Sequence, residues 1–302
     1  MRYLFAALRE QPPPTHVVAC FDAPAGSHAI RSGVTFRNEI YSDYKNHRAP
    51  TPPQVSEAVS MLMVLLPMIG VPVVSVPGVE ADDCIATLAS RFLADGVGVT
   101  IVSNDKDLHQ LLQPGVRALR SSPRGAPGFF EAYHEEDFRA QWGGLSPAQF
   151  VELQALMGDS TDNVPGVRGV GPKTAMKWVG EYGDVEGAIA AAERGELKPK
   201  RLCEVLTSPE GRHAARLSRE LVTIHCGLSV PPLTMPLESY ALRVPEDGGV
   251  EAVRLLLDME MAKTVEELQD MWAGRFGHRL DLATPGLLST SQTAVADRGQ
   301  PF

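Results

Sequence analysis

Short apolar runs that alternate with amphipathic segments constrain the fold of the first half of this chain more than any other feature. The runs at 16–21, 71–76 and 99–102 are rich in Val, whereas 51–69 and 80–95 place apolar residues at helical spacing. Strands that alternate with helices predict an α/β fold, with a parallel sheet covered by helices on both faces. In such sheets, functional groups gather at the carboxyl ends of the strands.

The second half of the chain has a different pattern. It is mostly helical, with Gly-rich interruptions, and we expect helices at 188–192 and 212–221. From 277 onward the sequence turns to Thr, Ser, Pro and Gly with few large apolar residues, which predicts a disordered tail. We therefore expect one domain in 1–142, a helical domain in 143–276 and a tail in 277–302.

The composition excludes some classes of protein. Hydrophobic residues make up 44% of the 302 residues, which is enough for a sizeable core. Lys and Arg number 28 against 37 Asp and Glu, a net charge of −9, which argues against a protein that coats nucleic acid with uniform positive charge. A nucleic-acid enzyme stays possible, because a metal site is locally acidic.

The chain shows no sign of export or membrane insertion. Its longest apolar runs are too short to cross a bilayer, and its first ten residues do not have the pattern of a signal peptide. The 4 cysteines lie far apart and form no CxxC pair, so we expect free thiols rather than disulfides or a zinc site. These observations favour a cytoplasmic location and no membrane partner.

Acidic residues recur after the predicted strands and at the starts of nearby helices and loops. They are Asp22, Glu80, Asp82, Asp83, Asp105, Asp107, Asp159 and Asp162. A lone Asp is most often a helix cap or a solvated loop residue. A converging set would be strongly repulsive without cations, and carboxylate oxygens select Mg²⁺ or Mn²⁺. The loop after Asp105 lacks the spacing of an EF-hand, so a paired-metal hydrolase is a better interpretation than a calcium sensor.

The segment 36–48 interleaves cations with aromatic residues between a predicted strand and a helix. It is either a solvated surface loop or a basic element that holds phosphates and stacks bases.

The segment 166–175 is the strongest single motif. A nucleotide-binding P-loop needs Gly directly before the Lys and a strand ahead of it, but Pro172 precedes Lys173 here. A Gly-rich turn that leads into a helix can instead present backbone N–H groups and Lys173 to a DNA phosphate, independently of sequence.

The segments 21–23, 37–52, 79–83, 103–108 and 156–166 together resemble the 5′→3′ exonuclease domain of bacterial DNA polymerase I and the wider flap-endonuclease family. The similarity covers the chain up to about residue 275. It implies a PIN-like parallel sheet flanked by helices, followed by a helix–three-turn–helix module (helix-hairpin-helix-like) that binds duplex DNA. The implied activity is hydrolysis of phosphodiester bonds at 5′ flaps, nicks and 5′ ends in DNA replication and repair.

The resemblance also implies roles for individual residues. The eight carboxylates named above match the family's ligands for two divalent metal ions, with Asp22 and Asp105 also catalytic. Arg37, Lys45 and Arg48 match DNA-binding positions of a helical arch, and Lys45 and Arg48 act on the scissile phosphate. The duplex-binding turn, where the family also commonly holds a monovalent cation such as K⁺, matches Gly166, Gly169, Gly171, Lys173 and Thr174.

One departure from the family pattern leaves alternatives open. The family begins with a strand that ends in Asp-Gly, and this chain has no such segment. Either the start was assigned too late, or the chain is a catalytically impaired relative that binds branched DNA. Cleavage of RNA by a PIN-type nuclease is disfavoured, because the Gly-rich turn would have no clear purpose there. We expect a monomer, working alone or beside a separate DNA polymerase.

Overall fold

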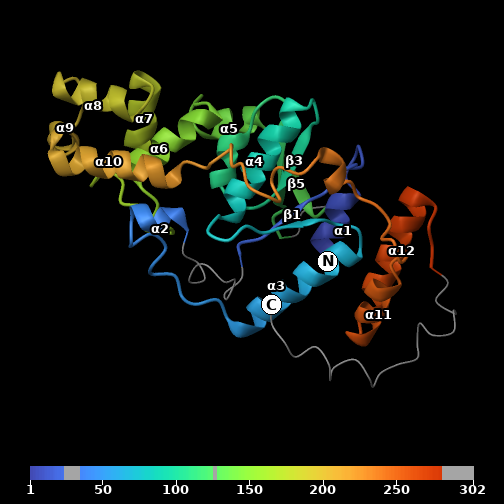
Figure 1. The fold of residues 1–302 in the computed structure, drawn as a ribbon. Coiled ribbons are helices and arrows are strands. Elements are labelled where there is room, and N and C mark those ends of the chain that lie inside the picture. The colour runs from blue at the N-terminus through green and yellow to red at the C-terminus, as the bar shows by residue number, and fades with distance from the viewer. Residues whose placement is uncertain (24–34, 125–127, 281–302) are drawn as a thin grey trace. The chain divides into compact units, whose positions relative to one another are not determined.

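The computed structural model describes residues 1–23, 35–124 and 128–280, and its helices and strands can be followed in Figure 1. The chain divides into two compact units. The first comprises Met1–Ala19, Pro53–Val73 and the chain from Pro236 onward, and the second comprises Cys20–Pro52 and Val74–Met235. The expected domain boundary at 142 stays a prediction. Most of the expected tail, 281–302, lies outside the described residues.

The first unit is helical. Its elements are α1 (Arg2–Leu8), α3 (Pro53–Met68), the 3₁₀ helix η3 (Leu237–Tyr240), α11 (Val250–Asp258) and α12 (Ala262–Phe276). Helix α12 packs against α1 and α11, and α11 packs against α3. Phe5 of α1 and Trp272 of α12 are fully buried.

A glycine is required where α11 begins. Gly249 has a φ of +87°, and a Cβ at this position would lie 1.9 Å from an atom of the Trp272 ring. Because both the backbone conformation and the space favour the absence of a side chain, only glycine fits against this indole.

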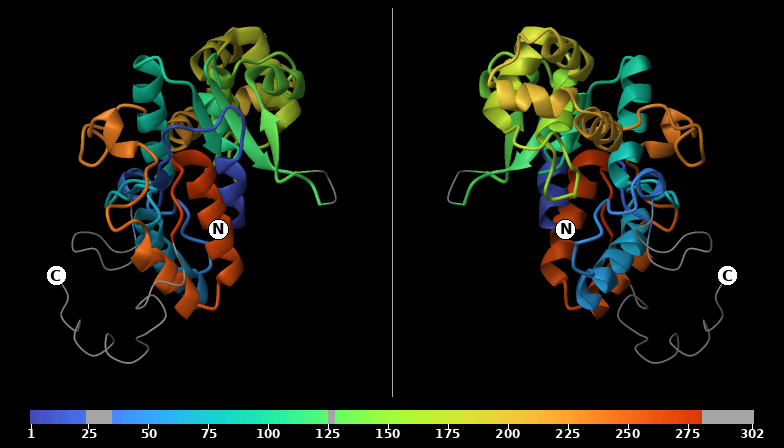
Figure 2. Two further views of the ribbon diagram at one scale, coloured as in Figure 1. Left: turned by 90° about the vertical axis from the view of Figure 1, so that its right-hand side faces the viewer. Right: turned by 90° about the vertical axis from the view of Figure 1, so that its left-hand side faces the viewer.

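The strands form two small sheets. Strands β1 (Ala19–Cys20) and β2 (Val73–Val74) pair with each other. Strand β3 (Val99–Val102) pairs in parallel with β4 (Val116–Ser121), which pairs antiparallel with β5 (Phe130–Tyr133). The green strands of the second sheet are visible in Figure 2.

The α/β prediction is confirmed, but the sheet differs in detail. The runs at 16–21 and 71–76 each contribute only two strand residues. In the described part of the chain the sheet is split in two, and the antiparallel strand β5 was not predicted. Its sequence, Phe-Glu-Ala-Tyr, is too short and too mixed for periodicity to identify.

The sequence predicts three helices of the second unit by residue range, at 80–95, 188–192 and 212–221. In the described residues this unit has ten helices, 3₁₀ helices included. They are α2 (Phe36–Ile40), α4 (Ala81–Ala94), η1 (Asp107–Leu111), α5 (Glu135–Gln141), η2 (Pro147–Gln149), α6 (Phe150–Met157), α7 (Pro172–Tyr182), α8 (Val185–Glu193), α9 (Lys200–Thr207) and α10 (Pro209–Val222). The helices expected at 188–192 and 212–221 lie within α8 and α10.

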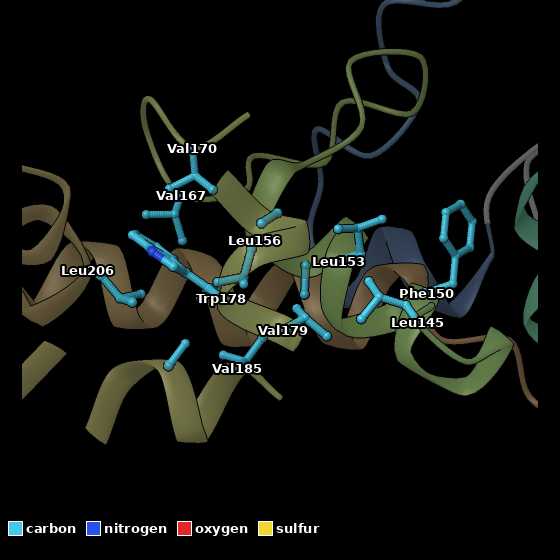
Figure 3. Close-up of a cluster of buried hydrophobic side chains, with 14 of the residues drawn as sticks. Leu145, Phe150, Leu153, Leu156, Val167, Val170, Trp178, Val179, Val185 and Leu206 are labelled. Atoms are coloured by element: carbon cyan, nitrogen blue, oxygen red, sulfur yellow. The ribbon is translucent and has the colours of Figure 1, made fainter. Parts of the chain in front are cut away.

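Helices α6 to α10 enclose one hydrophobic core, shown in Figure 3. Trp178 of α7 is fully buried in it, together with Leu156 of α6 and Leu206 of α9. Val167 and Val170 bring the Gly-rich turn into the same core. The turn is therefore anchored by apolar packing, and Arg168 and Gly169 are exposed between the two valines.

No helix in the described ranges is long and apolar enough to cross a membrane. All four cysteines are free, as expected.

Candidate functional site

Five of the eight predicted carboxylates line one small cavity in the second unit. They are Glu80, Asp82, Asp107, Asp159 and Asp162. The cavity has a volume of about 10 Å³, roughly the room that one water molecule needs. Arg37 and Tyr44 also line it.

Three separate elements bring these acids together. Glu80 is the N-cap residue of α4, and Asp82 lies in the first turn of that helix. Asp107 begins η1, shortly after β3 ends. Asp159 and Asp162 lie in the loop that follows α6. The carboxyl end of a strand, a helix start and a loop thus converge, which is the arrangement that the sequence pattern predicts.

Lys45 lies between two of the acids. Its Nζ is 2.9 Å from Glu80 Oε2 and 3.6 Å from Asp162 Oδ2. Its backbone has a φ of +55°, and its N–H donates to the Asp162 carbonyl at 2.9 Å. Burial alone would lower the pKa of Lys45, but the Glu80, Tyr44 and Asp162 charges raise it above its ordinary value, so the ammonium stays charged.

Two cations that do not line the cavity form ion pairs with Asp162 and Asp159. Arg48 Nη2 contacts Asp162 Oδ1, and Lys106 Nζ lies 2.6 Å from Asp159 Oδ2. Burial would raise the pKa of Asp159, but the hydrogen bonds from Lys106 and Thr161 hold it below its ordinary value. Asp159 and Asp162 are therefore compensated by cations of the chain itself.

Asp82 and Asp107 are less well compensated. Burial, together with the charges of Asp105, Glu80 and Asp22, raises the pKa of Asp82 to about 7. Burial and the Asp105 charge raise the pKa of Asp107 to about 6, although Gln154 donates to it at 2.6 Å. A surplus of negative charge thus remains at this end of the cavity.

Asp22 and Asp105 are exposed and lie outside the cavity lining. Asp22 Oδ1 accepts a hydrogen bond from the Ala81 N–H at 2.8 Å, at the start of α4. Asp105 Oδ1 accepts from the Asp107 N–H at 2.9 Å. Both carboxylates are thus held next to residues that line the cavity, and both raise the pKa of Asp82.

Asp83 and Arg37 are placed differently from the other predicted site residues. Asp83 is fully buried and forms a two-pronged ion pair with Arg37, at 2.7 and 2.9 Å. Only 2% of Arg37 is exposed. The predicted roles of these two residues, a metal ligand and a DNA contact, both require contacts that this pairing does not leave open.

The chemistry of the donor set fits a hard divalent cation. Its members are carboxylates, and burial, together with neighbouring carboxylates such as Asp105, raises the pKa values of Asp82 and Asp107. Within the described ranges, however, no three acidic, His or Cys side chains surround one point closely enough to hold a metal ion. Glu80, Asp159 and Asp162 are turned instead toward Lys45, Lys106 and Arg48.

The predicted duplex-binding turn lies between α6 and α7. Gly166 has a φ of +60°, and a Cβ there would lie 2.3 Å from the Gly158 nitrogen. Its N–H donates to Ser218 Oγ of α10 at 2.8 Å. Gly171 is the N-cap residue of α7, so Lys173 and Thr174 lie in the first turn of that helix. The Lys173 side chain is exposed and forms no ion pair with any described residue.

Sequence reasoning missed three residues of this site: Tyr44, Lys106 and Gln154. The hydroxyl of Tyr44 lies 3.4 Å from both Glu80 and Asp162. The position of Lys106 between two Asp residues after a strand was a usable signal. No pattern identifies Gln154, because it is one polar residue on a buried helix face.

Two family models match consecutive parts of the chain. The model "5'-3' exonuclease, N-terminal resolvase-like domain" matches residues 1–143, and "5'-3' exonuclease, C-terminal SAM fold" matches residues 145–247.

Curated relatives include two bacterial DNA polymerases I. The Bacillus caldotenax protein is 39% identical over 211 residues, 70% of this chain and 22% of the relative. The Streptococcus pneumoniae (strain ATCC BAA-255 / R6) protein is 34% identical over 274 residues, 88% of this chain and 29% of the relative. The chain thus spans less than a third of the length of these relatives.

Solved structures share the fold. The T5 5′-exonuclease with bound zinc has a TM-score of 0.54 and 20% identity, with 83% of both chains covered. The catalytic core of Rad2 in complex with DNA substrate has a TM-score of 0.52 and 17% identity, covering 84% of this chain and 77% of the other.

Proposed function

The chain belongs to the 5′-3′ exonuclease family, and on this premise we propose that it is a metal-dependent nuclease that hydrolyses phosphodiester bonds in branched or nicked DNA. The observation that carries the proposal is the acidic cavity, in which Asp82 and Asp107 have pKa values raised by burial and by neighbouring carboxylates. Carboxylate oxygens select hard divalent ions such as Mg²⁺ or Mn²⁺, and we propose that two of them bind.

In this proposal, seven of the eight predicted carboxylates are the ligands of these ions. They are Asp22, Glu80, Asp82, Asp105, Asp107, Asp159 and Asp162. Divalent ions in such a site supply a nucleophile at neutral pH and stabilise negative charge on the leaving oxygen. A solved structure with this fold, T5 5′-exonuclease, binds divalent zinc, which supports a divalent metal cofactor.

Lys45 and Arg48 act beside this site on the substrate phosphate. Both now pair with acids of the cavity, Lys45 with Glu80 and Arg48 with Asp162. With divalent ions bound to these carboxylates, Lys45 and Arg48 would be free to stabilise the negative charge of the scissile phosphate. Half of the Arg48 side chain is exposed, which gives it room to turn toward a substrate.

The turn between α6 and α7 holds the duplex part of the substrate. Gly169 is exposed and Gly171 half-buried at the surface of the turn, and Lys173 and Thr174 follow in the first helical turn. Gly166 is buried, and its bond to Ser218 fixes the base of the turn. Backbone N–H groups at a helix start bind a phosphate without reading sequence. A K⁺ ion at this turn belongs to the same proposal.

Cleavage of a labelled 5′-flap DNA tests the proposal. We expect cleavage with Mg²⁺ or Mn²⁺, none with EDTA, and loss of cleavage with retained DNA binding in the variant Asp105→Ala. Asp105 is exposed, so this change leaves the core intact. Full cleavage in EDTA, or by Asp105→Ala, would contradict the proposed site.

Duplex binding is tested separately, with Lys173→Ala. A lost phosphate contact weakens binding at every sequence and lowers the slope of log affinity against log salt by about 1. Glu181→Gln, at the other end of α7, is the control. An unchanged salt slope for Lys173→Ala would place the duplex elsewhere.

A second candidate function is binding of branched DNA without efficient cleavage. The observation that favours it is the pairing of Glu80, Asp159 and Asp162 with cations of the chain, with no three ligands gathered around one point in the described ranges. The two candidates differ in one measurement: flap binding with no cleavage at any Mg²⁺ or Mn²⁺ concentration supports the second.

Other parts of the proposal rest on the sequence. They are action as a monomer, work beside a separate DNA polymerase, a cytoplasmic location, and a division into a nuclease domain (1–142) and a DNA-binding domain (143–276).

A further inference from the structure

Arg37 is buried and uses its whole guanidinium within the protein. Its Nη1 and Nη2 bind the two oxygens of Asp83, and its Nε donates to the Leu221 carbonyl at 2.9 Å. Nη2 also donates to the Thr223 carbonyl at 2.9 Å. Leu221 and Thr223 lie at the C-terminal end of α10, where helical carbonyls lack partners. The side chain therefore joins α2, α4 and α10.

Asp83 makes the matching contacts from α4. Besides Arg37, it accepts the His225 N–H at 2.8 Å. No part of Asp83 is exposed. A carboxylate that is shared between a guanidinium and a backbone N–H has its charge and lone pairs compensated. The neighbouring Asp82, by contrast, lines the cavity.

The chain after α10 is held at two further points. Gln110 of η1 donates to the Val222 carbonyl at 2.9 Å and accepts the Ile224 N–H at 3.2 Å. Thr87 of α4 donates to the His225 carbonyl at 3.2 Å. Segment 221–225 is thus bonded to α2, α4 and η1.

The elements that meet at segment 221–225 also carry the candidate active site. The chain after α2 leads to Lys45, α4 begins beside Glu80, and η1 begins with Asp107. On the other side, Ser218 of α10 accepts the Gly166 N–H of the duplex-binding turn. Helix α10 and the segment 221–225 that ends it therefore connect the predicted duplex-binding turn to α2, α4 and η1.

We propose that Arg37 and Asp83 are a pair of positioning residues, which hold Lys45 and the cavity acids in register with the duplex-binding turn through the end of α10. Arg37 then contacts no DNA, and Asp83 holds no metal ion. This inference rests on the proposed nuclease function, because its effect is on the geometry of that site.

A double-mutant cycle tests the proposal, with Arg37→Gln, Asp83→Asn and the two changes together. Arg37→Gln leaves the buried Asp83 without its partner, and Asp83→Asn leaves Arg37 with only the more distant Glu80, at 3.6 Å. The double variant replaces the ion pair by a pair of amides. We expect each single variant to lower kcat on a 5′-flap by about 100-fold with little change in KM, as a small misplacement of reacting groups does. We expect the double variant to recover about tenfold.

Two binding measurements separate positioning from direct contact. Mn²⁺ binding, followed by electron paramagnetic resonance, should give the same number of ions for Asp83→Asn as for the unsubstituted protein. The salt slope of DNA binding should be unchanged in Arg37→Gln. A lost Mn²⁺ site, a slope reduced by about 1, or a double variant no more active than the singles would overturn the proposal.

The thermal unfolding midpoints of the same four proteins do not depend on activity. We expect the double variant to unfold at a higher temperature than the sum of the two single effects predicts. If the unsubstituted protein cleaves no flap, the nuclease proposal fails. The unfolding midpoints still show whether Arg37 and Asp83 are energetically coupled. If the shift in the double variant's midpoint equals the sum of the two single shifts, Arg37 and Asp83 are not coupled.

Discussion

Lys45 and Glu80 form an ion pair, 2.9 Å from Nζ to Oε2, at the edge of the acidic cavity. The same Nζ lies 3.6 Å from Asp162, so one ammonium serves carboxylates from two different elements. The protein thus carries its own counter-charge where we propose that metal ions bind. At Glu80 and Asp162, metal binding would then be an exchange of cations, whereas Asp82 and Asp107 are the less compensated acids of the cavity.

This exchange predicts opposite effects of Lys45→Ala on metal binding and on cleavage. Removal of the competing ammonium should strengthen Mn²⁺ binding, whereas flap cleavage should fall by about 100-fold, since one group that stabilises developing charge is lost. Mn²⁺ titration and single-turnover cleavage measure the two effects. The control is Lys263→Ala, an exposed lysine on α12. Weaker Mn²⁺ binding by Lys45→Ala would contradict the exchange.

The raised pKa of Asp82 predicts a pH-dependent effect of Asp82→Asn. The folded protein holds a proton on Asp82 up to about pH 7, whereas the unfolded chain releases it near pH 4. This group's contribution to the free energy of unfolding therefore decreases as pH rises from about 4 to 7. Asn resembles the protonated acid, so the variant should gain stability at pH 8 relative to pH 5.

Thermal unfolding in EDTA at the two pH values measures this gain. Asp258→Asn, at the end of α11, is the control because its side chain is exposed. An equal gain for Asp82→Asn at pH 5 and pH 8 would show that the carboxyl does not titrate in this range.

His109 predicts a loss of stability in acid. Both of its ring nitrogens are buried and have no hydrogen-bond partner among the described residues, and its ring lies 4.6 Å from that of Tyr133. Burial, aided by the Arg120 charge, lowers its pKa from 6.5 to about 4. The unfolded chain therefore takes up this proton first, and stability falls as pH decreases from about 6.5 to 4, by at most about 3 kcal/mol from this group.

His109→Leu should remove that part of the acid sensitivity. Urea unfolding at pH 7 and pH 4.5 gives the comparison, and the free energy of unfolding should fall less in the variant than in the unsubstituted protein. If both lose the same amount, His109 is not the group responsible.

The contact between Gly249 and Trp272 predicts a large effect of one methyl group. Gly249→Ala should destabilise the protein by about 3 kcal/mol, because it combines an unfavourable backbone conformation with a clash against a buried indole. Gly274→Ala is the matched control: this glycine lies inside α12 with nothing within 4 Å of its added Cβ. There the change should stabilise by about 1 kcal/mol through helix propensity. Similar unfolding midpoints for the two variants would contradict this packing argument.

Local patterns were enough to predict the helices at 51–69, 80–95, 188–192 and 212–221, but not the others by residue range. Helix α4 could be placed because its acidic first turn precedes an apolar stripe, and both signals lie within fifteen residues. Strands β4 and β5 could not, because their short sequences mix apolar and charged residues, and pairing rather than propensity determines them.

The same distinction applies to the candidate site. The acids could be identified because their residue type and their position after strands are properties of the sequence. Their partners could not, since Arg37 and Asp83 lie 46 positions apart, and the carbonyl of Leu221 lies 184 positions from Arg37. No local pattern showed which of two adjacent aspartates, 82 or 83, would line the cavity and which would be buried in an ion pair.

Gly158 and Gly166 meet backbone to backbone at the two ends of the loop that carries Asp159 and Asp162. A Cβ on Gly166 would lie 2.3 Å from the Gly158 nitrogen, so there is no room for a side chain between the two backbones. The two backbone segments are in direct contact where the loop begins and ends, so they must move together. If the turn binds a DNA phosphate as proposed, a displacement of the turn would therefore move the loop carboxylates with it, because no flexible side chain lies between the two backbones.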